Sequence, residues 1–128
     1  MTLVLDAGGV SGLVGERALL AAMRDRGHWP PDVPAVVLTE ALTGDHRRDF
    51  HANHLLRACR IRDVDELTAR EGARLRTATG RAGTISATDA VVAAYASTVH
   101  DPVVLTSDPS DLKALTARTL RPVVVLAT

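Results

Sequence analysis

Four acidic side chains in the sequence stand where they are able to act together on a ligand. Each one follows an apolar run that is typical of a buried strand, or opens an apolar helix. Carboxylates gathered at one place supply only oxygen ligands, which the hard cations Mg²⁺ and Mn²⁺ prefer. Their combined formal charge balances two divalent ions, as in the two-metal sites that activate water for attack on a phosphodiester. The four residues are Asp6, Glu40, Asp89 and Asp108.

Two of these acids each stand just beyond the carboxyl end of a predicted strand. Asp6 follows the strand predicted at 2–5 and precedes Ala7-Gly8-Gly9, which we interpret as a turn. Asp108 stands just past the strand predicted at 103–106. Sites in open α/β sheets form beyond the carboxyl ends of strands, where the strand order reverses. If these two strands are neighbours at that point, the two carboxylates face each other.

Each acid also has a purely structural explanation. Asp108 before Pro109 has the pattern of a helix N-cap followed by proline at the first helical position. Asp89 is the third residue after Ser86, which is capping-box spacing. We expect Asp6 to have no capping role. Because burying a carboxylate without a partner costs several kcal/mol, a partner or a cation is implied for it.

The elements that position these acids alternate between strands and helices. Apolar strands separated by helices favour an α/β fold with a mostly parallel sheet, and we expect one domain over residues 1–128 in a three-layer α/β/α arrangement. Strands are predicted at 2–5, 33–38, 60–62, 103–106 and 122–126. Helices are predicted at 11–26, from a Thr39 cap to Gly44, at 45–58, at 63–80, after a Ser86 cap to Ala96, and from Asp108 onward.

Composition restricts the class of protein. The sequence has 128 residues, of which 46% are apolar and 23% charged, so intrinsic disorder is excluded as the default. Fifteen basic residues balance fifteen acidic ones, which leaves no general attraction for a polyanion. Cys59 is the only cysteine, so neither an intramolecular disulfide nor a thiolate metal cluster can form. No stretch has the apolar length of a membrane span, and we expect a cytoplasmic protein without membrane contact.

The motifs around the four acids resemble those of a PIN domain, and specifically those of a VapC-type toxin ribonuclease. The resemblance runs over essentially the whole chain, and its motifs occur in the family's order and spacing. It implies a PIN-like fold and a Mg²⁺- or Mn²⁺-dependent endoribonuclease that is usually dimeric and is held inactive by a cognate VapB-type antitoxin. The motifs are Leu5-Asp6, Leu38-Thr39-Glu40-Ala41-Leu42-Thr43-Gly44, Ile85-Ser86-Ala87-Thr88-Asp89-Ala90 and Leu105-Thr106-Ser107-Asp108-Pro109-Ser110-Asp111-Leu112.

The resemblance also implies a role for individual residues. The metal-binding acids would be the four named above, Thr106 would place a hydroxyl near the metal, and Asp111 would be a fifth acid. One departure is that relatives commonly have Ser, Thr or Asn within two residues of the first Asp, where this chain has Ala7-Gly8-Gly9. A side-chain donor is therefore missing there, although the backbone amides of Gly8 and Gly9 are able to approach a phosphate.

The densest positive segment of the chain lies between Asp45 and Arg62. Arginine side chains match the geometry of phosphate, so Arg47 and Arg48 are candidates for contact with the RNA backbone. The alternative is a solvated helix face whose charge Asp45 and Asp49 moderate.

Two other functions stay open at this stage. A phosphatase of the haloacid-dehalogenase kind also begins with an aspartate at a strand end, but it needs a second aspartate at the position of Gly8. A PIN fold that binds an antitoxin or RNA without catalysis is the other alternative.

Overall fold

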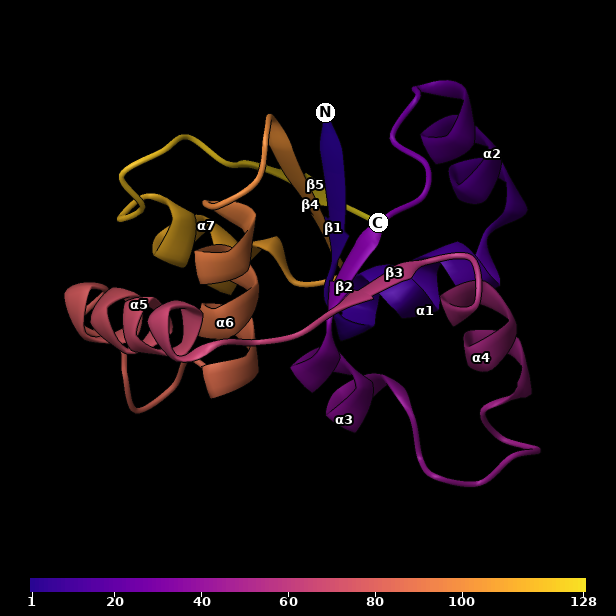
Figure 1. Ribbon diagram of the computed structural model, residues 1–128, viewed down its shortest axis with the longest axis horizontal. Coiled ribbons are helices and arrows are strands. Elements are labelled where there is room, and N and C mark those ends of the chain that lie inside the picture. The colour runs from indigo at the N-terminus through magenta and orange to yellow at the C-terminus, as the bar shows by residue number, and fades with distance from the viewer.

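Five parallel strands form the centre of the computed structural model, which describes residues 1–128 (Figure 1). The strands pair in the order β3-β2-β1-β4-β5, and every pair is parallel. They are β1 (Thr2–Leu5), β2 (Asp32–Pro34), β3 (Arg60–Arg62), β4 (Pro102–Thr106) and β5 (Val124–Ala127). The helices are α1 (Ala7–Gly15), α2 (Arg17–Asp25), α3 (Leu38–Ala41), α4 (Phe50–Leu56), α5 (Glu66–Ala78), α6 (Ala87–Ala96) and α7 (Pro109–Thr116).

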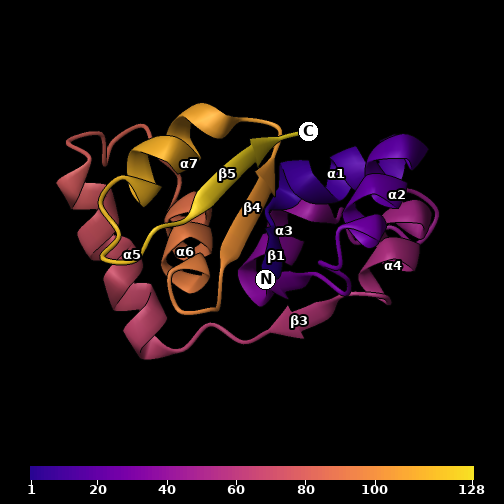
Figure 2. The same cartoon turned by 90° about the horizontal axis from the view of Figure 1, so that it is seen from above.

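The helices cover both faces of the sheet. Helices α1, α2 and α4 lie on one face, and α5, α6 and α7 lie on the other (Figures 1 and 2). The predicted three-layer α/β/α arrangement with a parallel sheet is therefore confirmed. One cluster of 23 buried hydrophobic residues fills the space between the layers. None of the helices has both the length and the apolar character that crossing a bilayer requires.

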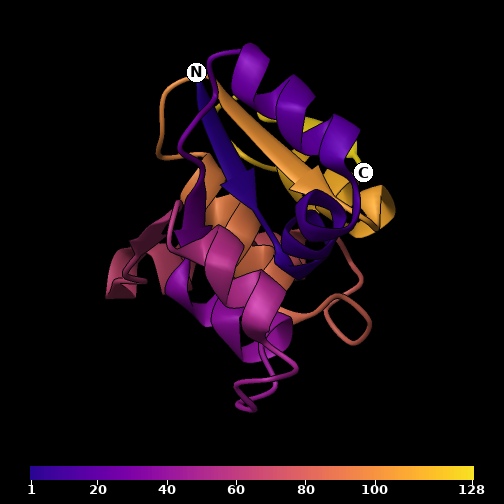
Figure 3. The same ribbon diagram turned by 90° about the vertical axis from the view of Figure 1, so that its right-hand side faces the viewer.

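The prediction for the segment after β1 is wrong. In place of a turn at residues 7–9 and one helix at 11–26, α1 begins at Ala7, and an extended Glu16 separates it from α2. Asp6 caps α1, because its Oδ1 accepts the Gly9 N–H at 2.7 Å. The glycines also allow α1 to approach β4. A Cβ on Gly9 would lie 2.3 Å from the carbonyl oxygen of Leu105, and Figure 3 shows the first turn of α1 beside the end of β4.

The second predicted strand is shorter than expected. The strand ends at Pro34, a 3-10 helix covers Ala35–Val37, and α3 follows directly. Proline lacks an N–H group, so the ladder cannot continue through it in a central strand. Thr39 is inside α3 and does not cap it, since its hydroxyl donates to the carbonyl of Val36 at 2.7 Å.

The predicted helix at 45–58 is also shorter, because Asp49 organises a loop in front of it. The Asp49 carboxylate is buried and accepts hydrogen bonds from Thr43 N, Thr43 Oγ1 and Gly44 N at 2.8 to 2.9 Å. These bonds, with that of the Thr43 amide the largest, lower the pKa of Asp49. Residues 45–49 therefore form turns, α4 starts at Phe50, and Asp49 is not a solvated charge on a helix face.

A buried carboxylate ties the first half of the sheet to the helix that covers it. Asp32 in β2 accepts the Tyr95 hydroxyl of α6 at 2.5 Å and the Arg60 Nε of β3 at 2.7 Å. Each of its oxygens has a partner, which is the condition under which a carboxylate is stable in a core. The network holds α6 in a fixed register over β2.

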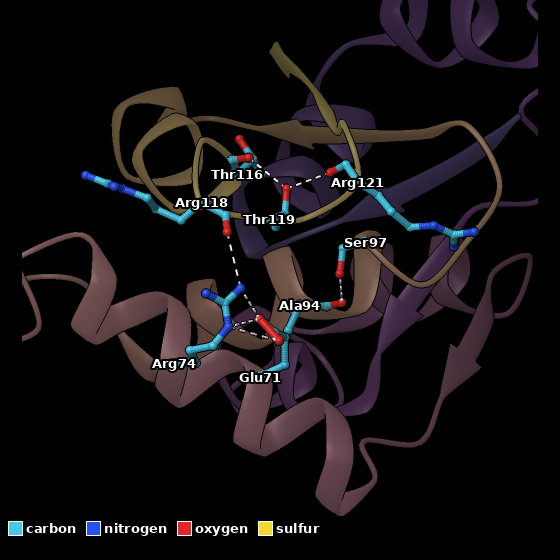
Figure 4. Close-up of polar contacts among 8 residues, drawn as sticks. All are labelled: Glu71, Arg74, Ala94, Ser97, Thr116, Arg118, Thr119 and Arg121. Carbon is cyan, nitrogen blue, oxygen red and sulfur yellow. Dashed lines mark hydrogen bonds and ion pairs between the residues drawn. The ribbon is translucent and has the colours of Figure 1, made fainter.

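A second polar link joins α5 to the connection between α7 and β5 (Figure 4). Arg74 pairs with Glu71 on the same helix and donates from Nη2 to the carbonyl of Arg118 at 3.2 Å. The Thr119 hydroxyl lies within 2.7 Å of the carbonyl oxygens of Thr116 and Arg121, and so closes that connection on itself. Helix α5 is thus held by its buried residues Gly72 and Leu75 and also by the polar contacts of Arg74.

Replacing Gly9 by alanine should lower the free energy of unfolding by about 1–3 kcal/mol, because the added methyl group meets the backbone of β4 and not a movable side chain. Gly15→Ala is the matched control. Gly15 lies in the same helix with open space around its Cβ position, so alanine there should be neutral or up to about 1 kcal/mol stabilising. Denaturant unfolding of both variants measures the difference, and equal stabilities would contradict the close approach of α1 to β4.

Candidate functional site

Asp6 stands at the centre of the carboxyl edge of the sheet. Its side chain is 6% exposed, and it follows β1 directly. Burial raises its pKa, the hydrogen bonds from the Thr106 hydroxyl and the Gly9 amide oppose that effect, and the charge of Glu40 raises it again. The expectation that Asp6 has a partner is confirmed, and the expectation that it has no capping role is wrong, because it is the N-cap of α1.

Strand β4 places Thr106 beside Asp6, and Asp108 follows two residues later in the chain. The register aligns Leu5 with Leu105, so β1 and β4 are neighbours, and the chain order reverses between them as the switch-point prediction requires. Thr106 is 1% exposed, and its hydroxyl accepts the Asp108 N–H at 3.1 Å. Asp108 is the N-cap residue of α7 and Pro109 takes the first helical position, as the pattern predicts. The Asp108 side chain is exposed and makes no capping hydrogen bond, so its carboxylate is not occupied by the helix.

Asp89 lies in the first turn of α6, and the negative charges of the other acids act on its carboxyl group. Ser86 caps the helix as predicted, since its Oγ accepts the Asp89 N–H at 3.0 Å. The pKa of the Asp89 carboxyl is raised to about 6, first by burial and then by the negative charge of Asp6, with smaller contributions from Glu40 and Asp111. A capping acid alone would not carry the repulsion of three other acids.

The remaining acids come from two further helices. Glu40 is exposed on α3, and Asp111 is half-buried in the first turn of α7. The negative charges of Glu40 and Asp111 both raise the pKa of Asp89. We use the name acidic cluster for the four residues that influence one another in this way. They are Asp6, Glu40, Asp89 and Asp111.

The donor set of the acidic cluster fits a hard divalent cation in its chemistry. It consists of carboxylates with the Thr106 hydroxyl beside them, and burial, with neighbouring negative charge adding to it, disfavours the ionised forms of Asp6 and Asp89. No three His, Cys, Asp or Glu side chains converge tightly enough to enclose a metal ion as they stand. The metal-binding roles of Asp6, Glu40, Asp89, Asp108 and Asp111 therefore stay predictions.

The glycines after Asp6 differ in what they offer a ligand. The Gly9 amide already donates to Asp6, so it is not free for the phosphate contact expected from it. The side-chain space of Gly8 is filled by Ser107, whose Oγ lies 2.1 Å from the position that a Cβ on Gly8 would take. A larger residue at position 8 would have to displace the end of β4.

Arginine side chains at two places could contact phosphate. Arg47 and Arg48 are exposed in the loop after α3, where the N–H groups of both donate to Asp45 Oδ1. Arg47 and Arg48 are therefore solvated beside Asp45, as the alternative expected, but on a loop and not on a helix face. Their contact with RNA stays a prediction. Arg81, which sequence patterns do not mark, has its Nη1 3.9 Å from Asp111 Oδ1.

A groove lined by helices α1, α2 and α4 combines apolar residues with basic side chains. Its volume is about 440 Å³, and it runs between α1, α2 and α4. Five of its lining residues are apolar and four are basic or histidine. They are Leu13, Val14, Leu20, Leu55 and Ala58 with Arg17, Arg24, His51 and His54.

Comparison with solved structures finds the same fold at low sequence identity. A chain of DNA-bound VapBC from Salmonella typhimurium matches with a TM-score of 0.71 and 15% identity, over 99% of this chain and 98% of that chain. VapBC2 from Rickettsia felis, bound to a DNA fragment from their promoter, matches with a TM-score of 0.72 and 13% identity, over 99% of this chain and 98% of that chain. FitAcB from Neisseria gonorrhoeae matches with a TM-score of 0.65 and 21% identity, over 96% of each chain.

No family model matches the sequence, and no curated protein does. The likeness to these structures covers nearly the whole chain, and it confirms the PIN-like fold that the sequence motifs imply.

Asp89→Asn should stabilise the metal-free protein at pH 7.5 by about 1–3 kcal/mol. The folded state binds the Asp89 proton with a pKa of about 6 against the usual 3.8, so the wild type loses stability as pH rises from about 4 to about 6. The asparagine variant has no such loss and keeps the Ser86 cap. Thermal melts in chelator at pH 4 and pH 7.5 measure the difference, which should vanish at the lower pH.

Asp65→Asn is the control of opposite sign. Asp65 caps α5 and its pKa is lowered, chiefly by the hydrogen bond from the Thr68 amide, so neutralising it should lower stability at pH 7.5. If Asp89→Asn also lowered stability at that pH, Asp89 would be a capping acid and not a member of a repulsive cluster.

Proposed function

We propose that the chain is a VapC-type toxin that hydrolyses RNA phosphodiester bonds with Mg²⁺ or Mn²⁺. The observation that carries the proposal is that Asp6 follows β1 at the point where the strand order reverses, and that burial and the negative charge of Asp6 together raise the pKa of Asp89 from a distant segment. Carboxyls that resist ionisation in this way cost stability, which supports a site built for a cation. The likeness of the fold to VapBC and FitAcB supports the same assignment.

Some residues of this site would hold the cations, and others orient the side chains that hold them. Asp6, Glu40, Asp89 and Asp108 would hold the cations, with Asp111 as a fifth acid. When bound, such cations lower the pKa of a water molecule and polarise the phosphodiester. The Gly9 amide fixes the orientation of Asp6 through Oδ1, and Thr106 links Asp6 to the backbone of Asp108.

The loop after α3 would extend the RNA-binding surface. Arg47 and Arg48 are exposed, and their backbone is held by Asp45, so both guanidinium groups are available to phosphates. A homodimer and a cytoplasmic location belong to the same proposal.

The groove between α1, α2 and α4 fits a cognate VapB-type antitoxin. Its apolar floor matches the apolar face of a helix, and the cations at its rim match acidic side chains on that helix. A groove of this kind on the helix that Asp6 caps would couple partner binding to the nuclease site.

Asp6→Asn should abolish cleavage of single-stranded RNA in Mn²⁺ and reduce the rise in melting temperature that Mn²⁺ causes. The amide keeps an oxygen to accept the Gly9 N–H, so α1 stays capped, but it is a poor ligand for a hard cation. Gel-based cleavage and melts with Mn²⁺ or chelator measure both effects. A wild type whose melting temperature is the same in chelator and in millimolar Mn²⁺ would overturn the metal site, and a wild type that binds Mn²⁺ without cleaving RNA would favour the non-catalytic PIN module.

Val14→Glu should weaken binding of the cognate antitoxin by at least about tenfold, because it puts a charge on the apolar floor among residues that must be desolvated. Val14 is 39% exposed, so the substitution spares the core. Leu120→Glu is the control, since Leu120 is 94% exposed in the connection between α7 and β5. Titration of the complex by calorimetry measures both, and equal losses would place the partner elsewhere.

A further inference from the structure

Arg81 is the one cationic side chain within ion-pair distance of the acidic cluster. Its Nη1 lies 3.9 Å from Asp111 Oδ1, its side chain is 44% exposed, and its guanidinium makes no hydrogen bond. The other Arg–carboxylate pairs of this chain are different. Arg60, Arg70 and Arg74 bond their partners through Nε at 2.6 to 2.7 Å. Arg81 therefore approaches the cluster without being bound to it.

The backbone of Arg81, in contrast, is fixed on both sides. Its N–H donates to Thr79 Oγ1 at 3.1 Å, and its carbonyl accepts the N–H groups of Thr84 and Ile85 at 2.9 Å each. The preceding Gly80 has a φ of +70°, which turns the chain out of α5 at a position suited to glycine. The point from which the Arg81 side chain projects is thus set by the fold.

Arg76 closes the same loop from the last turn of α5. Its guanidinium donates to the carbonyl of Ile85 from Nε at 3.0 Å and from Nη2 at 2.8 Å, and to the carbonyl of Ala82 at 2.8 Å. The loop leads directly into α6, whose first turn carries Asp89. Figure 1 shows this loop at the same end of the molecule as α3. We use the name Arg76 clamp for these three hydrogen bonds.

We propose that Arg81 is a substrate-binding residue that takes a phosphate of the RNA beside the acidic cluster, and that the Arg76 clamp positions it. The proposal rests on the proposed function, because it assigns the phosphate donor of that same site. A guanidinium with all its N–H groups free matches two phosphate oxygens. Its pair with Asp111 is longer than a hydrogen bond and partly solvated, so a phosphate is able to displace it.

The test compares Arg81→Gln with Arg70→Gln, which removes the same charge from an exposed, paired position on α5. Binding of a labelled single-stranded RNA is followed by anisotropy in Ca²⁺ over a range of salt concentrations, and cleavage is measured separately in Mn²⁺. Loss of one phosphate contact should reduce the slope of log affinity against log salt by about 0.7. We expect this reduction and a rise in KM of about tenfold for Arg81→Gln, and neither for Arg70→Gln.

Two further variants separate contact from architecture. Arg81→Lys should restore the salt slope, because the charge returns, but only part of the KM, because lysine cannot bind two oxygens in a fork. Arg76→Gln should raise KM with little change in kcat, and combining it with Arg81→Gln should add no further rise, since the clamp acts through Arg81.

The outcomes also distinguish this inference from the proposed function. RNA binding with an Arg81-dependent salt slope but no cleavage keeps Arg81 and overturns the nuclease. Cleavage with the same slope and KM in wild type and Arg81→Gln overturns the role of Arg81 and keeps the nuclease. A third outcome is that Arg81→Gln differs from the wild type only in the Mn²⁺ concentration that is needed to stabilise the protein against unfolding. That result would mean that Arg81 only neutralises Asp111, and it would also overturn the inference.

Discussion

The hydrogen bond between Asp6 and the Gly9 amide is the constraint on which the arrangement of the site depends. It starts α1 directly after β1, and the absence of a side chain at Gly9 lets that first turn lie against the backbone of β4. One capped turn therefore fixes where α1 lies against β1 and β4, and with it the position of Asp6 and of the groove between α1, α2 and α4. The Asp6 carboxylate caps α1 and also has a raised pKa, so truncating this side chain changes the helix cap and the acidic cluster together.

Other elements bring the acids to Asp6 at a cost in stability. Glu40 and Asp111 come from the first turns of α3 and α7, and Asp89 from that of α6. Negative charge near a helix N-terminus is favourable, which offsets part of the repulsion among the acids. The hydrogen-bonded Asp32 shows the alternative, a buried carboxylate with a partner for each oxygen and no negative neighbour.

Sequence patterns predict the parts of this molecule whose signals are local. The apolar runs of β1 and β4, the Ser86 cap of α6 and the helix after Asp65 are recognisable because each is set by a few adjacent residues. The start of α1 is not, since Ala7-Gly8-Gly9 has the composition of a turn and becomes helical through its contact with β4. In the same way, the run 33–38 is apolar enough for a strand, and only Pro34 ends it. Asp111 is recognised only through the family motif after β4, and the position of Arg81 has no signal in the sequence, because it depends on how the loop between α5 and α6 folds.

The loop between α5 and α6 is ordered by hydrogen bonds within the protein before any ligand arrives. The loop therefore loses its conformational entropy when the chain folds, so binding of a ligand does not have to order it. A contact from such a loop forms and breaks as a rotation of one side chain, on the nanosecond scale of exposed rotamers and not on the slower scale of loop closure. Under the proposal that this edge of the sheet binds RNA, the recognition step would be limited by diffusion of the RNA and not by rearrangement of the protein.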